Sequence, residues 1–118
     1  MSKSDERLKN YTFMSIYAMY VQKAERKNRT IDELDTVLAW LTGYEPSQIS
    51  QVEPEITLQQ FFDSVPALNP NADLIKGVIC GVRVEELTDR TVQLVRYMDK
   101  IVDELAKGKA LEKIMRTP

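Results

Sequence analysis

The stretch LIKGVICGVRVEEL, residues 74–87, brings together several side chains that could do chemistry. A cysteine thiolate next to a cation can act as a nucleophile. Two carboxylates whose pKa values are pushed apart by burial can act as a general acid and a general base. These types of residue make the stretch a candidate site of a small-molecule binder or a histidine-free enzyme. The candidate ligand-binding residues are Cys80, Arg83, Glu85, Glu86 and, further along the chain, Tyr97.

The same residues also have a structural interpretation. Cysteine is among the most buried residue types, and Cys80 stands between apolar neighbours near a predicted helix end, where the helix dipole does not lower a thiol pKa. Arg83 can pair with an acid and fix a link between helices. The sequence contains no histidine, which excludes Ser–His–Asp and Cys–His nucleophiles. With a single cysteine it also excludes an ordinary zinc site, so we predict no metal and no cofactor.

Composition predicts one globular domain. The chain has 118 residues, of which 43% are hydrophobic and 29% charged, an ordinary mix for a folded domain. The formal net charge is -2. This charge argues against nucleic-acid binding as the main function, because binding to phosphates needs an excess of basic residues. Weak binding through the basic run Lys23, Arg26, Lys27 and Arg29 stays open. The sequence shows no signal peptide and no membrane span, so we expect a cytoplasmic protein.

Apolar periodicity predicts a mainly α fold, a compact bundle of four to five helices with short links. Stripes at helical spacing cover residues 13–24, 31–41 and 92–105. Two capping boxes, at Thr30 and Thr57, predict helix starts, and Thr88 is the predicted cap of the long last helix. A further turn is expected around 111–115. We expect residues 1–10 to be a flexible tail and residues 11–118 a single helical domain.

Two periodicities compete in the opening stretch. Asn69 followed by Pro70 is typical of a helix start, and Gly81 can end a helix, so we predict a helix over about 70–80 and then an extended link. Alternating valines from Val78 to Val84 are instead typical of a strand. The alternative fold is therefore α+β, with a small strand pair near residues 78–86.

Aromatic and methionine residues outside the helix stripes favour a third kind of function. Trp40 lies beside the stripe of its helix, and Tyr44, Met14 and Met19 also fall off the stripes. Large side chains of this kind can anchor an interface. The leading hypothesis is a non-enzymatic interaction module, in one form a homodimer, with Trp40 and Tyr44 as candidate interface residues and with a protein partner of unknown identity.

The sequence resembles a bacterial family catalogued as domain of unknown function 2200. The resemblance rests on VQKAERKNRT, LAWLTGY, LNPNADLIKGVICGVRVEEL and RYMDKIVDELAKGKALEKIMR. Together these segments cover nearly the whole chain from Tyr11 onward. The family pattern has proline where this chain has Ala18, and glycine where it has Asn28. The resemblance implies a bacterial, cytoplasmic, single-domain protein, and it carries over no functional residue.

Overall fold

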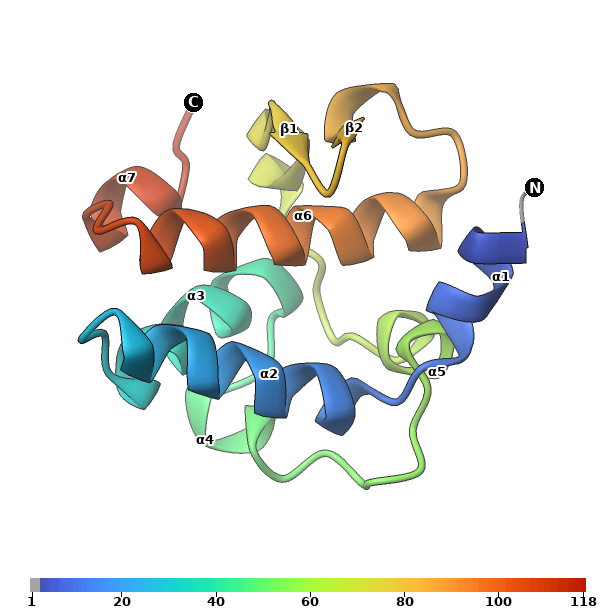
Figure 1. The fold of residues 1–118 in the computed structure, drawn as a ribbon, viewed down its shortest axis with the longest axis horizontal. Coiled ribbons are helices and arrows are strands. Elements are labelled where there is room, and N and C mark those ends of the chain that lie inside the picture. The colour runs from blue at the N-terminus through green and yellow to red at the C-terminus, as the bar shows by residue number, and fades with distance from the viewer. Residues whose placement is uncertain (1–2) are drawn as a thin grey trace.

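Helix α6 (Arg90–Ala106) is the longest element, and the rest of the fold packs around it. Its predicted apolar stripe is buried in full, from Val92 to Leu105. Figure 1 shows α6 above α2 and α3, with the two β-strands on its other side. The structure is a computed structural model that describes residues 3–118. Its helices are α1 (Lys3–Asn10), α2 (Phe13–Arg26), α3 (Ile31–Thr42), α4 (Pro46–Ile49), α5 (Leu58–Asp63), α6 and α7 (Leu111–Ile114).

The predicted capping boxes are present at the starts of α3 and α5. At α3, Thr30 Oγ1 accepts from the Glu33 amide at 3.0 Å, and Glu33 Oε1 accepts from the Thr30 amide at 3.0 Å. Thr57 and Gln60 form the same reciprocal pair at α5. These bonds satisfy backbone donors that a helix start leaves unpaired. The predicted mainly helical fold is confirmed, and α7 lies where a further turn was expected, around 111–115.

Residues 3–10 differ from the flexible tail that we expected over 1–10. They form α1, whose Leu8 side chain is buried and whose Lys9 Nζ lies 3.0 Å from Asp89 Oδ2. The polar sequence hides this because Leu8 is the only apolar residue of the helix. Asp89 also caps α6 by accepting from the Val92 amide at 3.1 Å, so the cap lies one residue after the predicted Thr88. Met1 and Ser2 lie outside the described residues.

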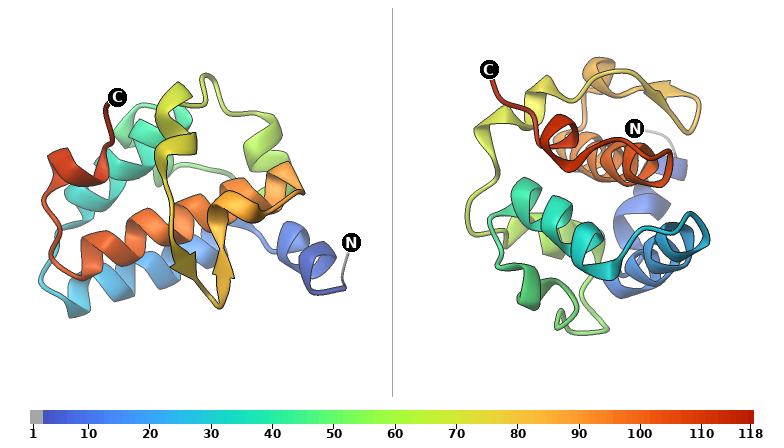
Figure 2. Two further views of the ribbon diagram at one scale, coloured as in Figure 1. Left: turned by 90° about the horizontal axis from the view of Figure 1, so that it is seen from above. Right: turned by 90° about the vertical axis from the view of Figure 1, so that its left-hand side faces the viewer.

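The predicted helix over 70–80 is wrong, and the alternative strand pair is confirmed. A 3₁₀ turn (Pro70–Leu74) ends early, and the strands β1 (Val78–Ile79) and β2 (Val82–Arg83) pair antiparallel. Both residues of the connecting turn have positive φ, 51° at Cys80 and 80° at Gly81. Positive φ at both positions is the pattern of a type I′ turn, whose twist suits a two-residue hairpin. Figure 2 shows the hairpin crossing over α6.

No helix within residues 3–118 is long and apolar enough to cross a membrane.

Candidate functional site

A groove lies where the tip of the β-hairpin meets α2 and α6. It has a volume of about 350 Å³. Four separate segments contribute its walls: the end of α1 with Tyr11, the outer face of α2, the hairpin tip and α6. We call it the hairpin groove. Its lining residues are Leu8, Tyr11, Ile16, Met19, Tyr20, Lys23, Ile79, Cys80, Val95, Arg96 and Asp99.

The groove has an apolar rim that is open to solvent. Tyr11 and Met19 are 46% and 56% exposed, which is high for side chains of this size. Ile16 and Ile79 are half-buried beside them. An exposed apolar surface that is also concave is a common feature of binding sites.

The charged side chains of the groove and the Tyr20 hydroxyl already have partners within the protein. Tyr20 Oη donates to Asp99 Oδ1 at 2.5 Å, and Arg96 Nη1 donates to Asp99 Oδ2 at 3.0 Å. Lys23 Nζ lies 3.1 Å from Asp103 Oδ1. Burial and the neighbouring Asp99 carboxylate raise the pKa of Tyr20 well above its ordinary value, so the phenol stays protonated. The groove therefore offers apolar contact more than acid–base chemistry.

Cys80 is exposed at the tip of the hairpin, where it forms part of the groove wall. The interpretation of Cys80 as a buried apolar residue near a helix end is therefore wrong. The reason is the turn: a two-residue loop points away from the core, whereas the helix that we predicted would have turned the residue inward.

Arg83 and Glu85 contact each other, and Glu85 also binds the backbone just before β1. Arg83 Nη1 lies 3.7 Å from Glu85 Oε2, and Glu85 Oε1 accepts from the Gly77 amide at 3.0 Å. This backbone hydrogen bond is the main cause that lowers the pKa of Glu85. Glu86 is exposed in the 3₁₀ turn that follows β2. The structure thus brings Arg83 and Glu85 together within the hairpin segment.

Tyr97 lies elsewhere, buried beside Asp73 and Arg90. Its hydroxyl donates to Asp73 Oδ1 at 3.1 Å, and Arg90 Nη1 lies 2.8 Å from the same oxygen. The Arg90 guanidinium also stands 5.9 Å from the centre of the Tyr97 ring. Burial, then the hydrogen bond to Asp73, raises the pKa of Tyr97. The structure therefore does not bring the five candidate residues together: Cys80 lies in the groove, Arg83 and Glu85 in the hairpin, Glu86 in an exposed turn and Tyr97 in this cluster.

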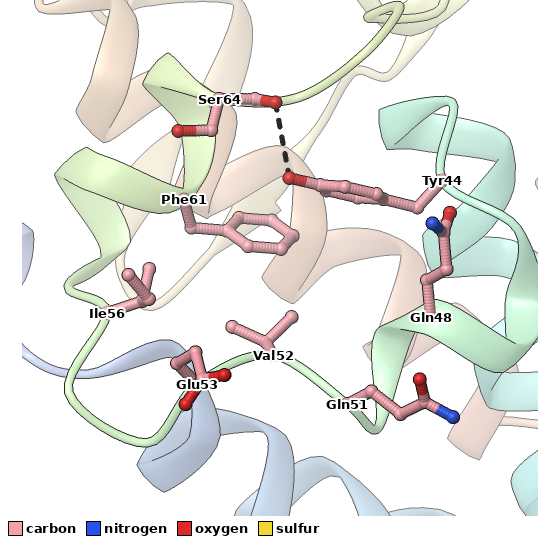
Figure 3. A pocket seen from close by; sticks show the side chains of 8 residues that line it. All are labelled: Tyr44, Gln48, Gln51, Val52, Glu53, Ile56, Phe61 and Ser64. Carbon is pink, nitrogen blue, oxygen red and sulfur yellow. Dashed lines mark hydrogen bonds between the residues drawn. The ribbon is translucent and has the colours of Figure 1, made fainter.

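The two candidate interface residues, Trp40 and Tyr44, are partly buried and pack against the core. Tyr44 borders a second hollow of about 320 Å³, where its hydroxyl donates to the Ser64 carbonyl at 3.2 Å. Figure 3 shows the apolar side chains of Val52, Ile56 and Phe61 facing the middle of this hollow. We call it the α4–α5 pocket.

The polar groups of the α4–α5 pocket offer little to a ligand. The Gln48 carboxamide oxygen accepts from the Glu45 amide at 2.8 Å and so serves the start of α4. Gln51 and Glu53 are exposed at the rim. All of the lining comes from residues 44–64, so the hollow is a local feature of one connection. Across residues 3–118 no three acidic or cysteine side chains gather as a metal site requires.

The prediction from sequence missed most of the hairpin groove. No sequence motif marks Tyr11 or Ile16 as site residues. The sequence marks Lys23 only as part of the basic run that could bind nucleic acid. One signal was present: Met19 falls off the apolar stripe of its helix, and it is the most exposed large apolar residue of the described chain. Contacts between α2 and α6 join residues about 80 positions apart, and no local pattern predicts them.

Fold and groove define a small, mainly helical module in which a β-hairpin lies across the longest helix. The chain belongs to the family described as an uncharacterized protein conserved in bacteria, domain of unknown function 2200, whose model matches residues 7–116. The crystal structure of the uncharacterized protein SP1917 is similar, with 38% sequence identity and a TM-score of 0.87. The match covers 98% of this chain and 93% of that one. A search of proteins with curated descriptions found no match.

Proposed function

We propose that the protein is a non-enzymatic interaction module of the bacterial cytoplasm, and that the hairpin groove receives apolar side chains of a protein partner. One observation carries the proposal: the groove is concave and apolar at its rim, while its charged side chains are paired within the protein. A site of this kind gains affinity by removing apolar surface from water.

The hairpin groove is a better candidate than the α4–α5 pocket for this role. Its rim includes Tyr11 and Met19, two of the large apolar side chains that the fold leaves exposed. It is also built from segments distant in sequence, so its shape depends on the whole fold. The groove is already formed in the protein without a partner, with α2 and α6 as two of its walls, and a preformed site lowers the entropy cost of binding.

Direct selection of binding peptides tests the proposal. A phage-displayed library of random peptides is selected on the wild-type protein, and the recovered peptides are tested on Met19→Glu and on Ile31→Glu. Both positions are exposed apolar residues, at 56% and 40%, but only Met19 borders the groove. Thermal melts check that each variant is folded.

We expect selected peptides that contain large apolar residues, that bind the wild-type protein and Ile31→Glu alike, and that lose about tenfold or more in affinity on Met19→Glu. Peptides that bind both variants equally would place the site elsewhere and contradict the proposal. Failure to recover any binding peptide would also count against it.

Self-association is the second form of this function. A homodimer that buries Tyr11 and Met19 would show a concentration-dependent mass in sedimentation equilibrium, which Met19→Glu would abolish. A strict monomer across the concentration series would leave binding to another protein as the function.

A further inference from the structure

The hairpin groove adjoins a basic hollow along the end of α2. This hollow, which is distinct from the α4–α5 pocket, shares Met19 and Lys23 with the groove and is otherwise lined by Gln22, Arg26 and Lys27. Lys23 and Arg26 follow Met19 by four and seven residues, so these three side chains lie on one face of α2, and Lys27 is the residue that caps the end of this helix. The apolar rim and the cations thus form one continuous surface.

This surface carries more positive than negative charge. Arg26 and Lys27 have no acidic side chain within ion-pair distance among the described residues, whereas Lys23 and Arg96 each have one. On α6, Asp99 and Asp103 face this surface and are both paired, Asp103 with Lys23 and also with Lys107 at 2.9 Å. The lining of the two hollows therefore includes four cations and one carboxylate, Asp99. The chain as a whole has a net charge of -2, so positive charge is concentrated here.

We propose that the partner of the hairpin groove is an acidic amphipathic segment of another protein. Its apolar side chains would seat between the hairpin tip and α2, and its carboxylates would lie along Lys23, Arg26 and Lys27. The inference rests on the proposed function and adds the chemical class of the partner. Charge complementarity across such a rim speeds association and selects against wrong partners.

Charge and shape favour this occupant over two others. A twofold axis through the groove would place one basic surface against a second copy of itself, and such like-charge contact is unfavourable. An anionic membrane attracts basic surfaces too, but membrane binding inserts protruding apolar side chains into lipid. A hollow with apolar walls instead fits side chains that project from a peptide.

Three synthetic peptides of about 15 residues test the charge of the partner. They share one helical stripe of Leu and Phe, and their remaining positions are mainly Glu, mainly Gln or mainly Lys. Affinity is measured by fluorescence anisotropy at about 0.05 M and about 0.5 M salt, concentrations between which exposed charges become screened. The proteins compared are the wild type, Arg26→Glu, Lys113→Glu and Met19→Glu. Arg26 and Lys113 match because each is a basic residue in the last turn of a helix, α2 and α7.

We expect the Glu peptide to bind the wild-type protein most tightly, and high salt to weaken its binding by about fivefold or more. Arg26→Glu should weaken it by about threefold or more, while Lys113→Glu changes it little. Met19→Glu should weaken all three peptides. Equal loss for Arg26→Glu and Lys113→Glu would mean a non-specific charge effect and would overturn the inference.

The failure of the inference and that of the proposed function are distinguishable. If the Gln or Lys peptide binds best and Met19→Glu still abolishes binding, the groove is a docking site but its partner is not acidic. If Met19→Glu changes no peptide's affinity, the proposed function itself fails. Cosedimentation with vesicles of phosphatidylserine and phosphatidylcholine is run in parallel. Vesicle binding that Arg26→Glu abolishes, without peptide binding, would assign the surface to lipid and overturn the inference.

Discussion

Tyr17 and Asp35 form a hydrogen bond of 2.6 Å between two buried side chains, one from α2 and one from α3. The Tyr17 hydroxyl donates, and Asp35 Oδ1 accepts. Desolvation raises the pKa of the Asp35 carboxyl, while the bond from Tyr17 partly opposes that rise. Burial, followed by the hydrogen bond to Asp35, raises the pKa of Tyr17. This contact is a direct polar link between the first two long helices.

The first prediction concerns removal of the donor. Tyr17→Phe should lower the free energy of unfolding by about 1–3 kcal/mol at neutral pH, because it leaves a buried carboxylate without its hydrogen bond. Asp35→Asn retains an acceptor for the tyrosine and serves as the control. Urea denaturation of both variants measures the effect. A Tyr17→Phe protein as stable as the wild type at neutral pH would contradict this account.

The raised pKa of Asp35 gives these variants a characteristic pH dependence. An acid whose pKa is higher in the folded than in the unfolded state stabilises the fold below its unfolded pKa, near 3.8. That contribution is lost as pH rises through the folded pKa. Asp35→Asn cannot titrate, so its stability relative to the wild type should increase as pH rises from acid to neutral. The defect of Tyr17→Phe should be smaller in acid, where a protonated Asp35 does not need the donor.

The second prediction concerns Asp89, which ties α1 to α6 and caps α6. Asp89→Ala should cost about 1 kcal/mol or more, the usual effect of losing an N-cap. Hydrogen bonding from Lys9, then from the Val92 amide, lowers the pKa of Asp89. Its contribution is therefore present above the ordinary aspartate pKa and is lost as pH falls through the lowered folded pKa.

Thr88→Ala is the matched control for Asp89→Ala. Thr88 is the cap that sequence predicts, but it is exposed, and the side chain that accepts from Val92 belongs to Asp89. The control should unfold in urea like the wild type, while Asp89→Ala should also show faster amide hydrogen exchange in α1. If Thr88→Ala lost more stability than Asp89→Ala, Thr88 would be the N-cap of α6 and this account would be wrong.

Local signals predicted much of the fold and little of the site. The capping boxes at Thr30 and Thr57, like the stripe of α6, depend on neighbours within one or two turns, so they can be predicted from sequence. Asn28, which stands where the family pattern has glycine, has φ of 62° in the turn after α2, a conformation that asparagine adopts more readily than most residues. The hairpin could not be predicted as the favoured form, because Cys80 is not a residue typical of a type I′ turn. The groove could not be predicted either, because Tyr20 and Asp99 come into contact only in the folded chain.

The third prediction concerns Gly43, which ends α3 with φ of 82°. A Cβ added there would lie 2.7 Å from the Ala67 carbonyl oxygen and 2.8 Å from the Ala67 nitrogen. Gly43→Ala should therefore cost about 2–4 kcal/mol, because backbone strain and a clash with backbone atoms add together. Gly108 has φ of 92° but open space around it, so Gly108→Ala should cost only about 1–2 kcal/mol. Equal losses in thermal melts would show that the close approach of Ala67 does not matter.

The last prediction concerns Cys80, whose φ of 51° is uncommon for a residue other than glycine, asparagine or aspartate. Cys80→Asn should raise the free energy of unfolding by about 0.5–1 kcal/mol, because asparagine tolerates the first position of a type I′ turn. Cys80→Val should lower it, since a β-branched side chain is strained at positive φ. Cys80→Ser, close in size, should change it little.

Thiol labelling of the folded protein checks the same turn independently. Because Cys80 is exposed, Ellman's reagent should modify it without denaturant and at a rate unchanged by low urea concentrations. Protection of the thiol until global unfolding would place it in the core and would contradict the hairpin. A labelled protein should also bind the Glu peptide more weakly, because the added group stands on the groove wall beside Tyr20 and Ile79. Unchanged affinity after complete labelling would separate the hairpin tip from the binding surface and would leave α2 and α6 as its walls.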